Sequence, residues 1–243
     1  LAETGHGPGH AAIALQYLHR ATAAAAEHPG DASLYSGLAG VGSALAHLQG
    51  RLPGLDGEDE LAEIDEVLLE HLEQSPWPDT YDLIGGLVGL GVYALEGRRR
   101  PGAVACLERV IEHLCEMAEH RSDGVTWVSC QEWLPADLHD RYPRRYCNLG
   151  LAHGVSGVVA MLGLACEAGI AVGEAEPLLE GAVRWLLAQQ LPDGFPSGIE
   201  LNPPAKPTRL AWCYGDPGVA AALLLAACCV NEPAWEREAL AIA

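Results

Sequence analysis

The chain has 243 residues, 49% of them hydrophobic, and its 33 acidic against 14 basic side chains give a formal net charge of −19. This excess of acid argues against nucleic acid and anionic lipid as direct partners, because both are polyanions. No run of about 20 apolar residues is present to span a bilayer.

The cysteines indicate the compartment. Eight are present, none forms a Cys-x-x-Cys pair, and several lie inside apolar patterns typical of helices. Free thiols of this kind suit a reducing compartment better than a secreted disulfide scaffold. The first residues also lack the charged start and apolar segment of a secretory signal. We therefore expect a cytoplasmic protein.

The first half of the chain predicts helices that alternate with glycine-rich turns. The Ala-rich stretch 9–28 predicts a helix that Pro29-Gly30 ends, and a second helix follows over 44–48. In 58–73 apolar residues recur at steps of three and four, which indicates an amphipathic helix with an acidic outer face. We interpret that face as solvated, with a docking surface as the alternative.

The second half repeats this pattern with one interruption. Helices are predicted over 102–120 and 174–190, and an apolar run over 219–230 predicts another. Residues 121–147 contain prolines and clustered arginines, which indicates an irregular excursion from the helical pattern. A short strand is predicted inside it, over 125–129.

An internal repeat, Gly-x-x-Gly followed by an apolar residue, is the main architectural signal. Its copies are Gly37/Gly40, Gly86/Gly89, Gly154/Gly157 and Gly215/Gly218. Each interval has room for two helices, an apolar one after the glycines and then a more amphipathic one. Because an apolar helix needs burial on all sides, this alternation predicts an inner ring of helices wrapped by an outer ring. We therefore expect one all-α domain over 1–243, an incomplete α/α toroid with its glycine-rich loops at one end.

Five side chains capable of chemistry lie in or beside three of these loops. They are Asp82, His153, Arg209, Cys213 and Tyr214. If the loops converge, these groups share one cleft and form a set suited to acid–base and nucleophilic chemistry. Each also has a structural interpretation: Asp82 as a helix cap, His153 as a turn residue, and Cys213 as an inert core thiol. The glycines need only permit tight turns.

Two motifs carry a resemblance to a known family. They are Asn148-Leu149-Gly150-Leu151-Ala152-His153-Gly154 and Trp212-Cys213-Tyr214-Gly215 with Pro217-Gly218. The repeats Ser36-Gly37-Leu38-Ala39-Gly40 and Tyr81-Asp82-Leu83-Ile84-Gly85-Gly86 support them. On these residues the chain resembles the LanC lanthionine cyclases, the lanthionine synthetase C-like proteins, over nearly its whole length.

The resemblance implies an α/α toroid with a zinc ion at its open end, held in the family by two cysteines and one histidine. Cys213 matches the first cysteine ligand, and His153, Asp82, Arg209 and Tyr214 match active-site positions of the family. The implied reaction of lanthipeptide biosynthesis adds a peptide cysteine thiol to dehydroalanine or dehydrobutyrine and forms a thioether ring. The implied partners are a dehydrated precursor peptide, a lanthipeptide dehydratase and a transporter, and such a complex would place the protein peripherally at a membrane.

The resemblance also implies roles for these residues. Zinc would hold the substrate thiol as a thiolate at neutral pH. Addition then leaves an enolate that needs a proton at its α-carbon. His153 is the candidate acid, Asp82 would orient it, and Arg209 and Tyr214 would stabilise the developing anion.

One feature departs from the family pattern. The second cysteine and the histidine ligand are adjacent in the family, in a Cys-His-Gly motif, and no Cys-His pair occurs in this chain. We therefore expect a C-terminally truncated cyclase that binds zinc weakly and is inactive by itself. The alternatives are a non-catalytic LanC-like scaffold that binds peptides or proteins, and an α/α-toroid glycosidase that uses Asp82 with Asp216.

Overall fold

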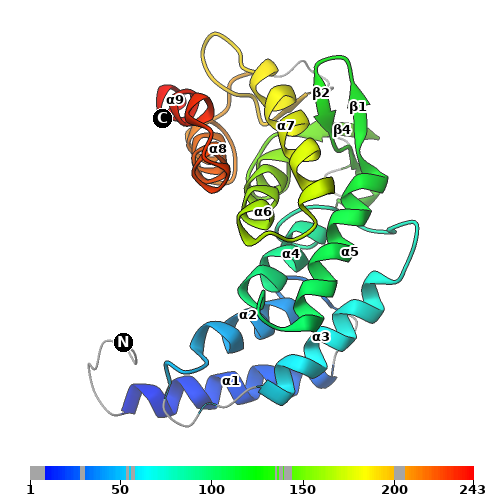
Figure 1. Cartoon of the computed structure of the whole chain (residues 1–243), viewed down its shortest axis with the longest axis vertical. Coiled ribbons are helices and arrows are strands. Elements are labelled where there is room, and N and C mark those ends of the chain that lie inside the picture. The colour runs from blue at the N-terminus through cyan, green and yellow to red at the C-terminus, as the bar shows by residue number, and fades with distance from the viewer. Residues whose placement is uncertain are drawn as a thin grey trace.

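The structure is a computed structural model, and it describes residues 9–27, 31–52, 55, 58–134, 136, 139, 144–199 and 206–243. Helices dominate these residues and follow one another along an open arc, with the N- and C-terminal ends on either side of its opening (Figure 1). The predicted all-α fold, an incomplete toroid, is confirmed.

Four helices form the inner layer of the arc, and each contacts the next. They are α2 (Leu38–Leu48), α4 (Leu87–Glu96), α6 (Val155–Ala168) and α8 (Asp216–Val230). Each packs against one helix of the outer layer: α3 (Glu58–Leu72), α5 (Pro101–Met117), α7 (Val172–Ala188) and α9 (Pro233–Ile242). Helix α1 (Gly9–Glu27) packs against α2 at the N-terminal end of the arc.

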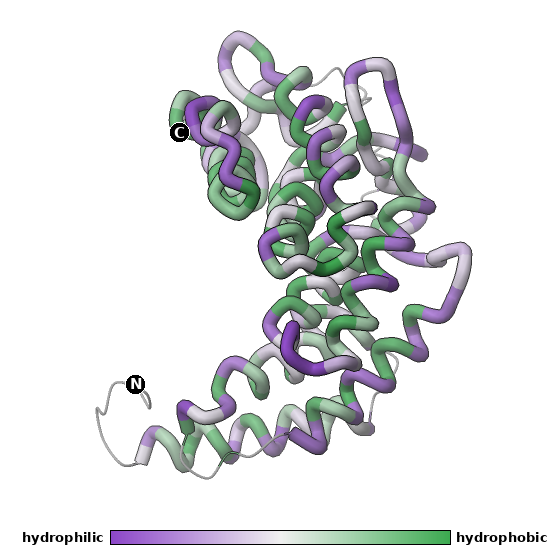
Figure 2. Tube along the Cα trace, in the orientation of Figure 1, coloured by the Kyte–Doolittle hydropathy of each residue, from purple (hydrophilic) through white to green (hydrophobic). Residues whose placement is uncertain are grey.

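Burial differs between the two layers as the sequence predicts. Inner α4 is buried along most of its length, whereas outer α5 buries one stripe of side chains that includes Leu107, Ile111 and Leu114. Figure 2 shows the matching alternation of hydrophilic and hydrophobic residues along α3 and α5. Leu225 of α8 is 39% exposed, and within the described part of the chain α6 is the inner helix against which α8 packs.

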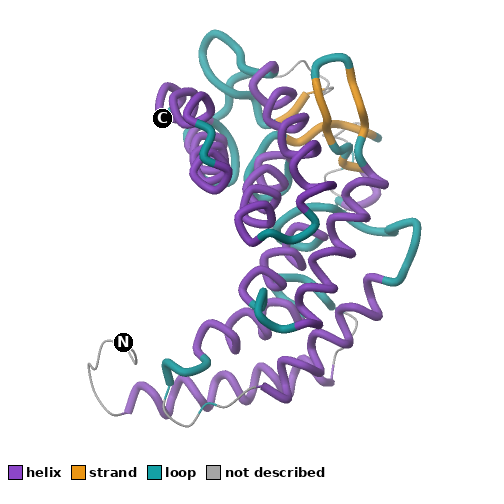
Figure 3. Tube along the Cα trace, in the orientation of Figure 1, coloured by secondary structure: helices purple, strands orange, loops and turns teal. Residues whose placement is uncertain are grey.

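The predicted excursion is a pair of small antiparallel sheets, drawn in orange in Figure 3. Strands β1 (Glu119–Arg121) and β2 (Gly124–Thr126) form one sheet. Strands β3 (Ser129–Cys130), β4 (Arg145–Asn148) and β5 (Gly198–Ile199) form the other, in the order β3-β4-β5. Residues 135, 137–138 and 140–143 of the excursion lie outside the described residues.

Two predicted boundaries in this region are wrong. The strand predicted over 125–129 is divided at Trp127, whose fully buried indole donates a hydrogen bond from Nε1 to the Leu114 carbonyl at 2.9 Å. The helix predicted over 102–120 ends at Met117, because residues 119–121 form β1 instead.

The remaining predicted helices lie close to their predicted positions, except that α2 begins at Leu38 rather than at 44, and one helix was missed. Pro29-Gly30, expected to end the first helix, lies outside the described residues. Helix α9 was not predicted, although its start carries two helix signals. The Glu232 side chain accepts a hydrogen bond from the Ala234 N–H, and Pro233 opens the first turn.

The four glycine-rich loops share one backbone arrangement. In each, the carbonyl oxygen six residues before the first glycine lies 2.1 to 2.6 Å from the position a Cβ would occupy there. Any side chain at that glycine would therefore displace the loop. The pairs of carbonyl and glycine are Asp31 and Gly37, Thr80 and Gly86, Asn148 and Gly154, and Arg209 and Gly215.

These loops lie side by side at one end of the inner helices. The Tyr35 N–H donates to the Ile84 carbonyl, and the Leu83 N–H donates to the Ala152 carbonyl, both at 3.2 Å. The Cys213 carbonyl packs against Gly150. The predicted convergence of the loops is therefore confirmed.

None of the helices in the described part of the chain has the length and apolar character that a membrane span requires.

Candidate active site

Asp82 and His153 meet across two of these loops. Nδ1 of His153 lies 2.7 Å from Oδ2 of Asp82, and Asp82 is only 8% exposed. The other carboxylate oxygen, Oδ1, accepts hydrogen bonds from the N–H groups of Ile84 at 3.0 Å and Gly85 at 2.8 Å. Both donors precede Leu87, the first residue of α4, so the carboxylate braces its own loop and does not cap the first turn of the helix. The capping interpretation of Asp82 is wrong.

His153 combines a fixed nitrogen with an open one. Its side chain is 43% exposed and precedes Gly154, the residue before α6. Because Nδ1 faces the carboxylate, the nitrogen that remains for chemistry is Nε2, and no described residue forms a hydrogen bond with it. A histidine held in this way by a carboxylate is a general acid–base arrangement.

The pair opens into a cavity of about 360 Å³ that we call the loop-end hollow. Its polar lining includes Thr80, Asp82, Ser129, Asn148, His153 and Tyr214. Apolar walls come from Ile84 and from Trp133 and Leu134 at the end of the 3₁₀ turn η1 (Gln131–Trp133). Apolar walls around a few polar groups are typical of small-ligand and peptide side-chain sites.

Three of the five candidate site residues meet in this hollow, and two do not. Asp82, His153 and Tyr214 line it. Arg209 is exposed, Cys213 is half-buried, and neither belongs to the described residues that line the hollow. Cys213 is next to Tyr214 in the chain, so its loop forms part of the wall although its thiol does not.

The second carboxylate of the glycosidase alternative lies elsewhere. Oδ1 of Asp216 accepts a hydrogen bond from the Phe195 N–H at 2.7 Å, and Asp216 begins α8. Among the described residues that line the loop-end hollow, Asp82 is the only carboxylate. Glycoside hydrolysis needs two carboxyl groups that face one site, so this alternative has no support.

The chain matches a protein family and a solved structure. The family model of the lanthionine synthetase C-like proteins matches residues 3–243. This chain belongs to that family. The search of curated proteins gave no match. Among solved structures, a nisin cyclase superposes with a TM-score of 0.75 at 20% sequence identity, over 93% of this chain and 61% of that one. This likeness shows the fold, and the LanC-like chain spans about three fifths of the cyclase it matches.

The described residues do not fit a zinc site. A catalytic zinc takes three protein ligands, and no three His, Cys, Asp or Glu side chains among the described residues are placed to hold a metal ion. One further thiol, Cys130, lines the hollow, but burial, with a smaller contribution from Glu132, raises its pKa and favours the thiol over the thiolate that binds metal. Weak zinc binding therefore stays a prediction, and no step below uses a metal.

Several residues of the hollow were missed as site residues. Ser129, Cys130 and Tyr146 come from strands outside the repeat, and no sequence pattern connects them to the loops. Asn148 did carry a signal, since it occupies the position six residues before the glycine, as Asp31 does in the first loop.

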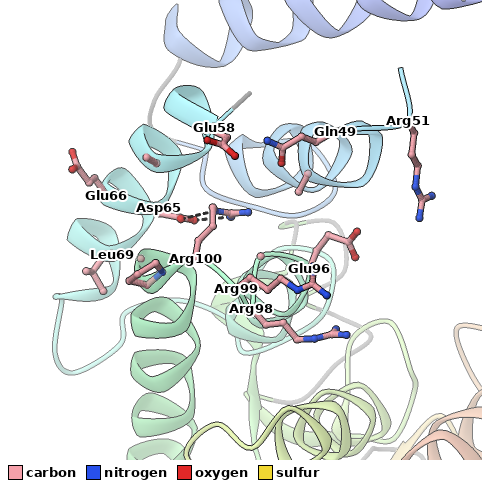
Figure 4. A pocket seen from close by; sticks show the side chains of 15 residues that line it. Gln49, Arg51, Glu58, Asp65, Glu66, Leu69, Glu96, Arg98, Arg99 and Arg100 are labelled. Carbon is pink, nitrogen blue, oxygen red and sulfur yellow. Dashed lines mark hydrogen bonds and ion pairs between the residues drawn. The ribbon is translucent and has the colours of Figure 1, made fainter. Parts of the chain in front are cut away.

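A larger cavity, of about 1030 Å³, lies at the opposite end of the inner helices, and we call it the far-end hollow (Figure 4). It is lined by the C-terminal ends of α2 and α4 and by α3. Its four arginines are balanced by four carboxylates, and Figure 4 shows Asp65 bound to Arg100. Despite its size, the described residues that line this cavity include no histidine and therefore no pair like that of His153 and Asp82.

Proposed function

We propose that this LanC-like chain provides the proton-transfer site of a lanthionine cyclase. The contact between His153 and Asp82 carries this proposal, because it leaves Nε2 open in a cavity with apolar walls. The substrate class is a dehydrated precursor peptide. In it a cysteine thiol adds to dehydroalanine or dehydrobutyrine.

The addition needs one proton to be placed on carbon. The sulfur forms a bond to the β-carbon, and the electrons of the carbon–carbon double bond move onto the adjacent carbonyl as an enolate. The protonated Nε2 of His153 then gives its proton to the α-carbon. The proton lost by the thiol replaces the one that His153 has given, so the reaction needs no further reactant.

Asp82 and Tyr214 support this transfer in different ways. The carboxylate accepts the Nδ1–H bond, which fixes the ring orientation. Tyr214 lines the hollow, and its phenol is the candidate for stabilising the enolate. Arg209 and Cys213 lie in the same loop outside the lining residues, so their family roles require further groups or movement of this loop.

The test is ring closure by the natural gene product that contains these 243 residues. It is incubated with a dehydrated precursor peptide, and the loss of free peptide thiols is measured by alkylation and mass spectrometry. We expect thiol loss with the wild-type protein and nearly none with His153→Asn. The 243-residue chain by itself is expected to be inactive. Unchanged thiols with the wild-type gene product would overturn the proposal.

The second candidate is a non-catalytic LanC-like scaffold that binds peptides. The observation that favours it is the absence of a three-ligand metal cluster among the described residues. It predicts that the gene product binds the dehydrated peptide and leaves all its thiols free. Calorimetry measures peptide binding and the thiol assay measures ring closure, so the two measurements together distinguish a scaffold from a cyclase.

A further inference from the structure

Asn148 presents an unused hydrogen-bond donor to the loop-end hollow. It is the last residue of β4, is only 4% exposed, and lines the hollow together with Asp82 and His153. Its Oδ1 accepts a hydrogen bond from the Gly150 N–H at 2.9 Å. No described residue forms a hydrogen bond with its Nδ2, so the amide NH₂ is free to donate to a ligand.

The orientation of this amide is fixed by chemistry. The two ends of an asparagine side chain look alike in most structures, but the Gly150 N–H can only donate, so the atom that faces it must be the oxygen. The nitrogen is therefore the end that remains. This nitrogen is not among the described side-chain atoms that are buried without a hydrogen-bond partner, so solvent reaches it, and a ligand in the hollow can replace that water.

The backbone around Asn148 is held rigidly. The next residue, Leu149, donates its N–H to the Ser197 carbonyl at 3.1 Å, and its own carbonyl accepts from Oγ of Ser156 at 2.6 Å. The Asn148 carbonyl packs against Gly154. A donor fixed before the ligand arrives needs little reorganisation, which is the property that makes oxyanion stabilisation effective.

We propose that Nδ2 of Asn148 stabilises the enolate oxygen during thioether formation. This inference rests on the proposed function. When sulfur adds to the β-carbon, negative charge moves onto the carbonyl oxygen next to the α-carbon. The Asn148 NH₂ donates a hydrogen bond to that oxygen while Nε2 of His153 delivers a proton to the α-carbon. The two residues belong to one loop and therefore hold the two reacting atoms from one rigid support.

The first loop of the same chain shows that the turn alone does not need an amide. Asp31 occupies the position equivalent to Asn148, and its Oδ1 accepts a hydrogen bond from the Ser33 N–H, also at 2.9 Å. A carboxylate thus makes the same turn two residues ahead. Asp31 does not line the loop-end hollow. The NH₂ group is what distinguishes Asn148 from Asp31, and of these two residues Asn148 is the one that lines the hollow.

The test compares two substitutions that keep the turn and remove the amide NH₂; a serine hydroxyl can also donate, but it is shorter and does not reach the position of Nδ2. In Asn148→Ser the hydroxyl still accepts from the Gly150 N–H, and in Asn148→Asp a carboxylate does so, as in the first loop. Ring closure by the gene product is measured over a range of peptide concentrations. Because the hydrogen bond strengthens only as the enolate forms, we expect kcat to fall about 100-fold with KM within about threefold of wild type. Urea unfolding of each variant should stay close to wild type.

Each outcome separates this inference from the proposed function. If the wild-type protein closes no rings, the proposed function fails and this inference fails with it. If wild type closes rings and both variants do so at its rate, only the role of Asn148 is overturned. Unfolding of both variants, or a rise in KM with kcat unchanged, would make Asn148 a residue for the turn or for peptide binding and would also overturn the inference.

Discussion

Asp82 and Asp65 are buried carboxylates at opposite ends of the inner helices, and they differ in what their partners leave open. Asp65, on α3, accepts hydrogen bonds from the Tyr93 hydroxyl at 2.5 Å and from Nε and Nη2 of Arg100 at 2.8 and 2.9 Å. Asp82 accepts two backbone N–H groups and faces Nδ1 of His153. Both carboxylates have several hydrogen-bond partners. Among these partners, only His153 has a second ring nitrogen that can bind or release a proton.

The partners of Asp65 keep one charge state at neutral pH. Burial, reinforced by Asp65, raises the pKa of the Tyr93 phenol, and the hydrogen bond to Asp65 raises the pKa of the Arg100 guanidinium. Neither group releases or takes a proton near pH 7. The far-end cluster is therefore a structural tie between α3, α4 and the start of α5, whereas the loop-end pair can exchange a proton. Cavity size, which favours the far end, does not identify the chemistry.

The largest expected effect comes from removing the open nitrogen. His153→Asn should lower the rate of ring closure by about 1,000-fold, since general acid–base catalysis contributes on this scale. Its unfolding free energy should change by less than about 1 kcal/mol, because the side chain is 43% exposed. The matched control is His47→Asn at the far end, where the histidine contacts Arg51 and Glu96. Equal losses in the two variants would contradict the difference between the ends.

At the far end, a substitution of Asp65 should lower the stability of the fold rather than the rate of ring closure. Asp65→Asn leaves Arg100 without its anionic partner in a site where the Asp65 side chain is only 4% exposed. Loss of one partner from a buried ion pair costs about 3 kcal/mol. Urea unfolding measures this cost, with exposed Glu66→Gln as the control. Ring closure per folded molecule should be unchanged, and a selective loss of rate would show that the far end takes part in catalysis.

Asp82→Asn distinguishes the roles of the two carboxylate oxygens of Asp82. The amide oxygen can keep the N–H bonds of Ile84 and Gly85, but the NH₂ end cannot accept the Nδ1–H bond of His153. We expect a loss of about 100-fold in ring closure, together with a modest loss of stability. Rate and urea midpoint are measured on the same preparation. A variant that closes rings at the wild-type rate would show that Asp82 only braces its loop.

The smallest expected effect concerns the first loop and depends on pH. Hydrogen bonds from Ser33, and a weaker one from Ser36, hold the pKa of the Asp31 carboxyl below its usual value of 3.8. A carboxyl with a lowered folded-state pKa stabilises the fold above the unfolded value, and this contribution is lost as the pH falls through the folded value. Wild type should therefore unfold at slightly more urea than Asp31→Asn at pH 7. At pH 3 the gap should shrink, and a wider gap there would contradict the assignment.

The sequence predicts the elements that follow from spacing and fails where contacts are not periodic. The Gly-x-x-Gly repeat requires equivalent loops, and equivalent loops on neighbouring helices must lie together, which brings Asp82 to His153. Ser129 and Cys130 line the hollow from β3, which follows Trp127. Trp127 bonds to the Leu114 carbonyl, and no sequence pattern reveals this pairing. Arg209 and Cys213 were expected inside the hollow from their loop alone, but a loop position does not fix the direction of a side chain.

The most direct test of proton delivery by His153 is the configuration of the α-carbon in the thioether product. A proton that comes from one fixed nitrogen reaches one face of the enolate, so the wild-type gene product should form a single epimer. With His153→Asn the slow residual addition takes its proton from water and should give both epimers, which chiral analysis of the hydrolysed rings resolves. The same single epimer at the wild-type rate from His153→Asn would contradict the account.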